Sequence, residues 1–420
     1  MIRLKEIQKL NFDSIPVDPF WNIGSERELK MHRIHSFPAK FPAFITTKAL
    51  EYAKLNSVKV KVIGDIFCGC GTTAYESKRN NIDFWGCDIN PVATMIAKTK
   101  SRKYQGWRLN KYLNEIIETY ESTTINEEYG NANDRLKYWF KEHEFDCLFH
   151  LKNIIEKITS EESDYRRFFI CAFSNILKPT SVWLTKSIKP QVDPQKKPAD
   201  VKKAFVDQCI YMINANEQSD FSNNSLSNIE NCNFLNENVK MPNVDLIITS
   251  PPYVTSYEYA DLHQLSSLWL NYAKDYRDLR KGSIGSLYQD YNFNREWKRL
   301  NITGNKIVSM LIDKGISKSR SVAKYFLDMQ AVTTKSYRML NDNGIVLFVI
   351  GNTEYKGILI DNAKHLAESL IDSGFSNIYA TKRKISKKIL TPYRDEKGKF
   401  TSDAGGRMVY NEEFIIIGEK

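Results

Sequence analysis

The chain has 420 residues and carries 60 lysines and arginines against 50 aspartates and glutamates, a formal net charge of +10. This length accommodates two or three average domains, and a hydrophobic content of 42% supports a sizeable core, which excludes a disordered chain. The positive charge favours a polyanionic partner. The first residues lack the apolar core of a signal peptide, and no apolar run approaches the ~18 residues of a membrane span. We therefore expect a cytoplasmic protein without membrane spans, whose seven cysteines are reduced thiols.

A group of regular elements is expected between residues 59 and 100. Residues 59–67 form a β-rich run that stops at a glycine-rich turn, and residues 72–80 have a helical pattern. A second short strand is expected over residues 84–88, and Asn90 and Pro91 begin another helix at a position where proline is tolerated. This order predicts a strand, helix and strand unit.

The middle of the chain has a different character. From residue 101 to residue 190 the apolar residues recur at helical spacing, and no strong strand is indicated. The stretch 186–198 is rich in lysine and interrupted by prolines, so it cannot continue a helix and is expected to be an exposed loop. We interpret residues 101–215 as a mainly helical insertion with a basic loop, which separates residues 1–100 from residues 216–420.

Strands return in the C-terminal part. Residues 244–249 and 344–350 are apolar enough to be buried parallel strands, and residues 413–417 suit the last strand. Alternation of strands and helices on both sides of the insertion predicts an α/β fold with a doubly wound, mostly parallel sheet.

A glycine-rich loop follows the first strand, between Asp65 and Thr73. Gly69 and Gly71 let the backbone turn tightly and approach a ligand at the carboxyl end of a strand. Asp88 ends the next strand about twenty residues on, where a carboxylate accepts both hydroxyl protons of a ribose. A nucleoside-containing cofactor fits this arrangement. The same loop satisfies the loose dinucleotide fingerprint, so it does not separate S-adenosylmethionine from NAD, and a tight turn without a ligand is a further alternative.

A second motif, made of Ser250, Pro251, Pro252 and Tyr253, directly follows the strand expected over residues 244–249. The two prolines fix φ and leave the carbonyls of Ser250 and Pro251 pointing outward without competing N–H donors at the prolines. An exocyclic amine is a poor nucleophile because its lone pair is delocalised, and acceptors that hold its hydrogens turn that lone pair toward an electrophile. Tyr253 offers a face for stacking a base taken out of a duplex. An ordinary proline turn is the alternative, but it seldom has a serine before and an aromatic residue after it.

These motifs together resemble the S-adenosyl-L-methionine-dependent amino-methyltransferases of DNA, which act on cytosine N4 or adenine N6. The residues that carry the resemblance are the Ser-Pro-Pro-Tyr loop, residues 67–71 and residues 88–91. Residues 35–42 are similar to the family segment that folds over the methionine part of the cofactor. The resemblance covers roughly residues 30–100 and 228–420. It implies a class I, Rossmann-like methyltransferase fold with a helical insertion, S-adenosylmethionine as cofactor and double-stranded DNA as partner.

Within this family the chain looks closest to the cytosine-N4 enzymes with an SPPY loop. Residues 257–270 and 279–286 are similar to the segments located after the catalytic loop in those members, and the adenine-N6 enzymes more often carry aspartate where Ser250 stands. The resemblance implies direct methyl transfer after base flipping, in restriction–modification or host DNA modification. A cognate restriction endonuclease acting on the same site would then be a further partner. The sequence departs at residues 231–234, which lack the acidic residue that often contacts the cofactor adenine.

The resemblance also names site residues. It places catalysis on the Ser250 to Tyr253 loop and cofactor contacts on Phe37, Pro38, Ala39, Asp65, Phe67, Gly69, Gly71, Thr72, Asp88 and Asn90. DNA contacts are expected outside the sheet, in the helical insertion, the basic loop and a segment from about residue 277 to 325, since these parts are basic and a flipping enzyme holds the duplex on both sides of the base. The cations expected to contact DNA are Lys186, Lys189, Lys196, Lys197, Arg277, Arg280 and Lys281.

Other functions explain the motifs of this sequence less well. Cys68, Cys70 and Cys87 lack a fourth ligand, so no metal is expected, and no Pro-Cys pair supplies the nucleophile of a cytosine-C5 enzyme. His35 and His263 are expected to make structural contacts. An NAD-dependent oxidoreductase would explain the glycine loop but gives the Ser-Pro-Pro-Tyr loop no role. An adenine-N6 enzyme, an RNA methyltransferase and a silent DNA-binding protein on the same fold stay open.

Overall fold

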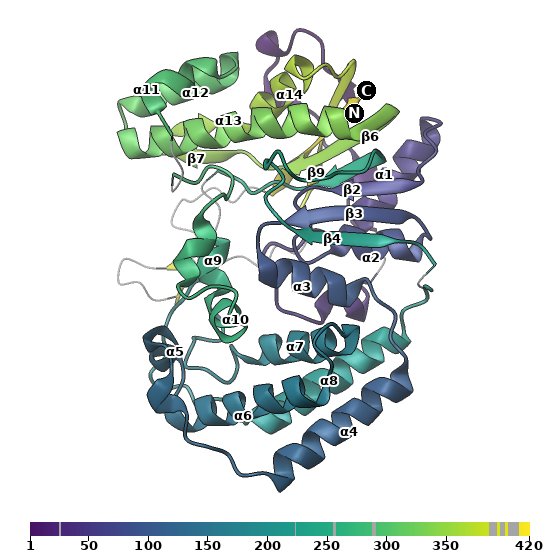
Figure 1. Ribbon diagram of the computed structural model, residues 1–420. Helices are drawn as coiled ribbons and strands as arrows, with labels where there is room; N and C mark the ends of the chain where they lie inside the picture. The colour runs from purple at the N-terminus through teal and green to yellow at the C-terminus, as the bar shows by residue number, and fades with distance from the viewer. Residues whose placement is uncertain are drawn as a thin grey trace.

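The structure is a computed structural model that describes residues 1–24, 27–222, 224–254, 258–287, 291–385 and 411–420, together with the backbone of two short strands, β10 (Tyr393–Arg394) and β11 (Phe400–Thr401). Figure 1 shows a sheet covered by helices on both faces, with a separate layer of helices below it. No helix in the described part of the chain is long and apolar enough to span a membrane.

The sheet has eight strands in the order β1-β9-β12-β6-β5-β2-β3-β4. The strands are β1 (Ile2–Arg3), β2 (Val62–Asp65), β3 (Asp83–Asp88), β4 (Ser227–Asn231), β5 (Val244–Thr249), β6 (Leu340–Ile350), β9 (Asn377–Lys384) and β12 (Glu412–Glu419). From β4 to β6 all neighbours are parallel, whereas β12 runs antiparallel to both β6 and β9. The strand order reverses beside β2, so the sheet is doubly wound, and the predicted class I α/β fold is confirmed.

Alternating side chains of the strands pack against different helix layers, as the two-residue period of a strand requires. Leu246 and Ile248 face the layer of α1 (Ala43–Leu55), α2 (Thr72–Arg79) and α3 (Pro91–Lys100). Ile247 faces the opposite layer of α12 (Ile302–Ile312), α13 (Ile316–Met339) and α14 (Asn362–Asp372). Both faces of the central strands are therefore buried, which explains their continuous apolar runs. Two smaller elements complete this part, the helix α11 (Phe293–Glu296) and the hairpin of β7 (Thr353–Tyr355) and β8 (Ile358–Ile360).

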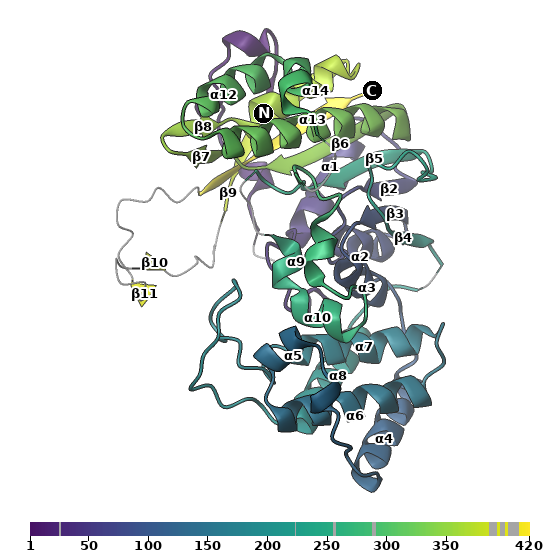
Figure 2. The same ribbon diagram turned by 60° about the vertical axis from the view of Figure 1, so that its left-hand side comes forward.

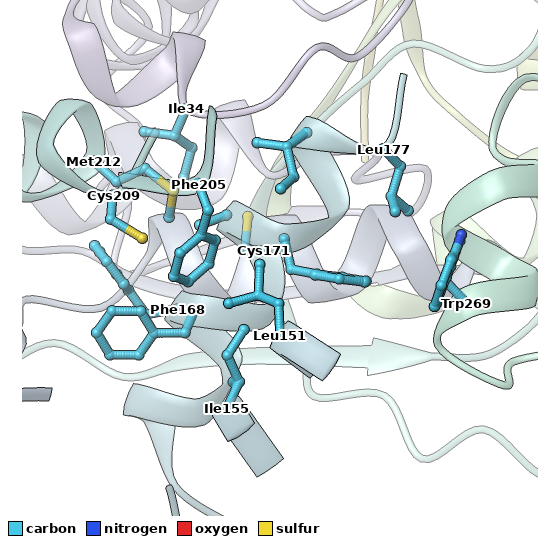
Figure 3. Packing of buried hydrophobic residues seen from close by; sticks show 14 of the residues in the cluster. Ile34, Leu151, Ile155, Phe168, Cys171, Leu177, Phe205, Cys209, Met212 and Trp269 are labelled. Atoms are coloured by element: carbon cyan, nitrogen blue, oxygen red, sulfur yellow. The ribbon is translucent and has the colours of Figure 1, made fainter. Parts of the chain in front are cut away.

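The helical periodicity expected from residue 101 onward corresponds to a layer of five helices, α4 (Gly106–Ser122), α5 (Asp134–Trp139), α6 (Glu142–Ile158), α7 (Asp164–Ile176) and α8 (Val201–Glu217). Figure 3 shows how their apolar side chains meet, with Phe168 and Phe205 beside Cys171 and Cys209. Trp269 joins this cluster from α10 (Gln264–Trp269). In both Figure 1 and Figure 2, α10 and the short helix α9 (Tyr259–Leu262) lie between the sheet and the helical layer.

Candidate active site

The loops after β2 and β5 meet where the strand order reverses. Strand β2 pairs with β3 on one side and β5 on the other, and all three run parallel, so their carboxyl ends share one edge. Open α/β sheets bind ligands at such a reversal, because the loops diverge and leave a crevice. Asp65 at the end of β2 accepts a hydrogen bond of 2.7 Å from the Thr249 hydroxyl at the end of β5. Burial raises the pKa of Asp65 to about 7, and the two loops are linked through this buried bond.

The glycine loop has the tight backbone that its sequence predicts. Gly69 and Gly71 have φ values of 48° and 76°, a region that side chains disfavour. A Cβ atom on Gly71 would lie 2.5 Å from the Cβ of Ala97, so the loop packs directly on α3. The backbone N–H of Gly69 donates to Oδ2 of Asp88 over 2.9 Å. The loop is therefore fixed both to α3 and to the end of β3.

Asp88 is arranged to accept further hydrogen bonds. Its Oδ1 accepts from the backbone N–H of Asn90 over 2.8 Å, and the half-buried carboxylate keeps free lone pairs on both oxygens. Burial raises its pKa to about 6. Two nearby polar atoms, Nδ2 of Asn90 and Oγ1 of Thr72, are buried and have no hydrogen-bond partner among the described residues. Buried polar groups normally have partners, so this cradle fits a nucleoside-containing cofactor.

The segment of residues 35–42 lies over the glycine loop. A Cβ atom on Gly69 would be 3.6 Å from Cε1 of Phe37, and the Phe37 ring stacks on His263 at 4.9 Å between ring centroids. His35 contacts Ser174 of α7 through Nε2 over 2.9 Å. Burial lowers the pKa of His35 to about 4 and that of His263 to about 3. Both rings are therefore neutral and serve as packing groups. Phe37 thus contacts the glycine loop, and Ala39 has a left-handed backbone conformation, with φ 53°.

The Ser-Pro-Pro-Tyr loop is anchored at both ends. The Ser250 hydroxyl donates to the carbonyl of Val349 in β6 over 3.0 Å. The Tyr253 hydroxyl donates to Oε1 of Glu413 in β12 over 3.0 Å. Burial raises the pKa of Tyr253 well above its usual range, so the phenol stays neutral. The loop therefore lies at the carboxyl end of β5 with its first and last side chains held by neighbouring strands.

No protein-family model matches the chain. It is 24% identical over 416 residues to the type II methyltransferase M.MvaI of Kocuria varians, a match that covers 92% of this chain and 90% of that protein. The chain is thus similar to a type II methyltransferase over most of its length. A second such enzyme, M.MjaII of Methanocaldococcus jannaschii, is 32% identical over 93 residues, which cover 22% of this chain and 17% of that protein.

Among solved structures, the rRNA methyltransferase AviRa of Streptomyces viridochromogenes matches this chain. It matches with a TM-score of 0.30 and 7% identity, over 93% of this chain and 91% of that one. A second structure of the same protein matches with a TM-score of 0.27 and 8% identity, over 92% of this chain and 88% of that one.

The basic residues expected at DNA have varied surroundings. Lys186, Lys189 and Lys197 are exposed. Lys196 points inward, because its ammonium donates to the carbonyls of Lys178 and Trp183 over 2.8 Å each, and burial lowers its pKa to about 8. The loop of residues 186–198 is therefore not exposed along its whole length, because the inward Lys196 ties it to the part of the chain that directly follows α7.

The three cations after α10 pair with carboxylates. Arg277 pairs with Asp275, Arg280 with Asp261, and Lys281 with Asp278. Residue 257 and residues 288–290, which fall in two segments singled out from the sequence, lie outside the described residues. Asp275 and Asp278 lie in the same segment as the cations they bind, whereas Asp261 lies in α9, so Arg280 links the segment to that helix.

Several residues at the site carry no sequence signal. Glu413 and Arg383 form an ion pair behind Tyr253, and Gly351 contacts its ring. Tyr259 stacks on Phe37 at 6.3 Å between centroids. These residues belong to ordinary strand or helix patterns, so only the fold brings them to the loops.

Proposed function

We propose that the protein transfers the methyl group of S-adenosylmethionine to the exocyclic N4 amine of cytosine in double-stranded DNA. The observation that carries the proposal is that the glycine loop and the Ser-Pro-Pro-Tyr loop lie on adjacent parallel strands, linked by the 2.7 Å bond between Thr249 and Asp65. A cofactor held by the first loop would then face a base held by the second. The similarity to the type II methyltransferase M.MvaI over 92% of the chain supports the same reaction class.

The residues of the glycine loop fit the proposed cofactor. The carboxylate of Asp88 would accept the ribose hydroxyls, since its bonds from Gly69 and Asn90 leave acceptor positions open. Phe37 covers Gly69 and would exclude water from the methionine part. When bound, S-adenosylmethionine supplies a methyl group on a sulfonium that is already an activated leaving group.

The Ser-Pro-Pro-Tyr loop would position the amine. The hydroxyl hydrogen of Ser250 is used on the carbonyl of Val349, so its oxygen is oriented as an acceptor. We assign the two hydrogens of the target amine to this oxygen and to the carbonyl of Pro251, an arrangement that withdraws the nitrogen lone pair from the ring. Tyr253, with its hydroxyl already bonded to Glu413, would present only its ring to the base.

A covalent enzyme intermediate is not part of the proposal. Cys68 lies in the glycine loop, but burial raises the pKa of its thiol well above the usual range, so it stays protonated and unreactive. Direct attack by the amine needs positioning and no protein nucleophile. Serine at position 250 supports cytosine N4 over adenine N6 as the acceptor.

The DNA contacts are proposed outside the sheet. The exposed lysines Lys186, Lys189 and Lys197 would contact phosphates, together with the segment that begins at Arg277. A restriction endonuclease acting on the same site is proposed as a functional partner.

Expression in a host that lacks DNA methylation tests the proposal, because sequencing of the host DNA then reads the modified base and its sequence context. We expect N4-methylcytosine at a fixed motif, and none in cells that express Ser250→Ala. N6-methyladenine alone would overturn the base assignment, and methylated RNA with unmodified DNA would overturn the substrate.

A further inference from the structure

We propose that Glu413 and Arg383 are positioning residues that hold Tyr253 in the orientation needed to stack the target base. This inference rests on the proposed function, since it concerns how the base is received. Neither residue belongs to a motif of the catalytic loop. Both lie at the ends of strands β9 and β12, far from Tyr253 along the chain, and they reach it only through the fold.

The hydrogen bonds form a chain of three side chains. Tyr253 donates its hydroxyl proton to Oε1 of Glu413 over 3.0 Å, and the guanidinium of Arg383 pairs with Oε2 of the same carboxylate. Arg383 and Glu413 stand directly opposite each other in the antiparallel pair of β9 and β12. Each carboxylate oxygen therefore has its own partner, one neutral and one charged.

Burial strengthens the interactions among these three side chains. The side chains of Arg383 and Glu413 are only 5% and 17% exposed. A carboxylate removed from water needs a cation, and Arg383 supplies one without competing for the oxygen that Tyr253 uses. A phenol bonded to an ionised carboxylate forms a charge-assisted bond, which is stronger than a bond between neutral groups. The hydroxyl of Tyr253 is thus fixed before any base arrives.

Gly351 fixes the ring at a second place. It follows β6, and a Cβ atom built on it would lie 2.9 Å from Cε2 and 3.4 Å from Cδ2 of Tyr253. Contacts of a real Cβ at 2.9 Å do not occur, so the ring takes its place only because residue 351 has no side chain. The ring is therefore held by its hydroxyl and along one edge. A preorganised aromatic face loses less freedom when a base stacks on it, which favours capture.

The same two strands offer a matched control. Lys382 and Glu412 form another ion pair at 3.4 Å, one residue away from Arg383 and Glu413 in each strand. Successive residues of a strand point to opposite faces, and Lys382 also donates to the carbonyl of Asp13 over 2.8 Å. Glu412→Gln removes a carboxylate from the same strand end but leaves the bond between Tyr253 and Glu413 intact.

A double-mutant cycle of Tyr253→Phe and Glu413→Gln tests the proposal. Phe keeps the ring and removes the hydroxyl, and Gln keeps the size of Glu413 and removes its charge. We expect each change to lower kcat on DNA by roughly tenfold, the range of one charge-assisted hydrogen bond, with cofactor Kd unchanged. The double variant should be no slower than the slower single variant, since both changes break one bond. Glu412→Gln should keep the wild-type kcat.

Fluorescence of 2-aminopurine at the target position reports stacking independently of turnover. Stacking on Tyr253 should quench the flipped fluorophore in the wild type, and Glu413→Gln should lose much of that quenching. Gly351→Ala should have the same effect through the ring edge, which keeps the test decisive if Glu413→Gln fails to fold.

Two results would overturn the inference alone: wild-type kcat and quenching in Glu413→Gln, or losses in the double variant that multiply. An inactive wild-type protein would instead overturn the proposed function, and the inference with it.

Discussion

Replacement of Asp88 by alanine tests the cofactor site in the most detail. Asp88 is half-buried, accepts from Gly69 over 2.9 Å and from Asn90 over 2.8 Å, and would accept the ribose hydroxyls with its remaining lone pairs. Hydrogen bonds to a charged group contribute about 1.5–3 kcal/mol, so Asp88→Ala should weaken S-adenosylmethionine binding by about that amount. This corresponds to roughly a tenfold to 150-fold increase in Kd.

Isothermal titration calorimetry measures this change directly. Asp88→Asn keeps one acceptor oxygen but places an amide donor against a backbone N–H, so its loss should lie close to that of alanine. Asp83→Asn is the matched control, because Asp83 lies at the opposite end of β3, where its Oδ1 accepts from the backbone N–H of Leu226 over 2.7 Å. Unchanged affinity in Asp88→Ala would refute the ribose assignment.

The pH dependence of binding depends on the same residue. Burial raises the pKa of Asp88 to about 6, so the carboxylate takes up a proton as the pH falls through that value. The protonated group loses its charge and part of its acceptor capacity. Affinity for the cofactor should therefore fall below about pH 6 in the wild type, and this step near pH 6 should be absent in Asp88→Asn. A step of equal size in both proteins would show that another group is responsible.

Three further predictions concern catalysis, DNA contact and stability. Ser250→Ala should lower kcat by about 10²–10³ through loss of one hydrogen-bond acceptor, with the cofactor Kd nearly unchanged in calorimetry. An equal loss of kcat and of cofactor affinity would show that Ser250 supports the folded structure and does not act on the amine. Lys197→Gln should weaken DNA binding and flatten the dependence of DNA affinity on salt. Lys196→Gln should mainly lower the Tm, because Lys196 donates hydrogen bonds to two backbone carbonyls. Equal salt slopes in the wild type and Lys197→Gln would place Lys197 away from the phosphates. Burial raises the pKa of Asp65 to about 7 in the folded protein, above the ~3.9 of a free aspartate, so its contribution to stability is greatest at low pH and is lost as the pH rises through about 7. Between about pH 5 and pH 8 the Tm of Asp65→Asn should therefore fall less than that of the wild type, and parallel profiles in thermal unfolding would contradict this.

Local backbone chemistry made much of the framework predictable. The glycine loop needs φ values that only glycine adopts easily, and Gly69 and Gly71 have them. The Ser-Pro-Pro-Tyr loop follows an apolar run that could only be a buried strand, and β5 ends at Thr249 directly before it. Because parallel strands end at one edge, the placement of both loops could be predicted from the sequence alone.

Contacts between distant segments were not predictable in this way. Glu413 has the pattern of an edge residue of the last strand, and nothing near it in sequence indicates that it bonds Tyr253. Lys196 stands in the same basic stretch as its exposed neighbour Lys197, yet it points inward because the carbonyls of Lys178 and Trp183 lie within reach. The first strand is also shorter than the run that predicts it, since pairing limits β2 to Val62–Asp65. In each case a contact with a distant part of the chain sets the side-chain direction or the strand length, and the local sequence pattern does not predict that contact.

The most direct test of the proposed reaction uses S-adenosylmethionine with a deuterated methyl group and unmethylated DNA. After incubation with the purified protein, the DNA is digested to nucleosides and analysed by mass spectrometry. We expect deuterated N4-methylcytosine from the wild type and a strongly reduced yield from Ser250→Ala. Label in 5-methylcytosine, or no label in any nucleoside with an intact and folded protein, would contradict direct transfer to the cytosine amine.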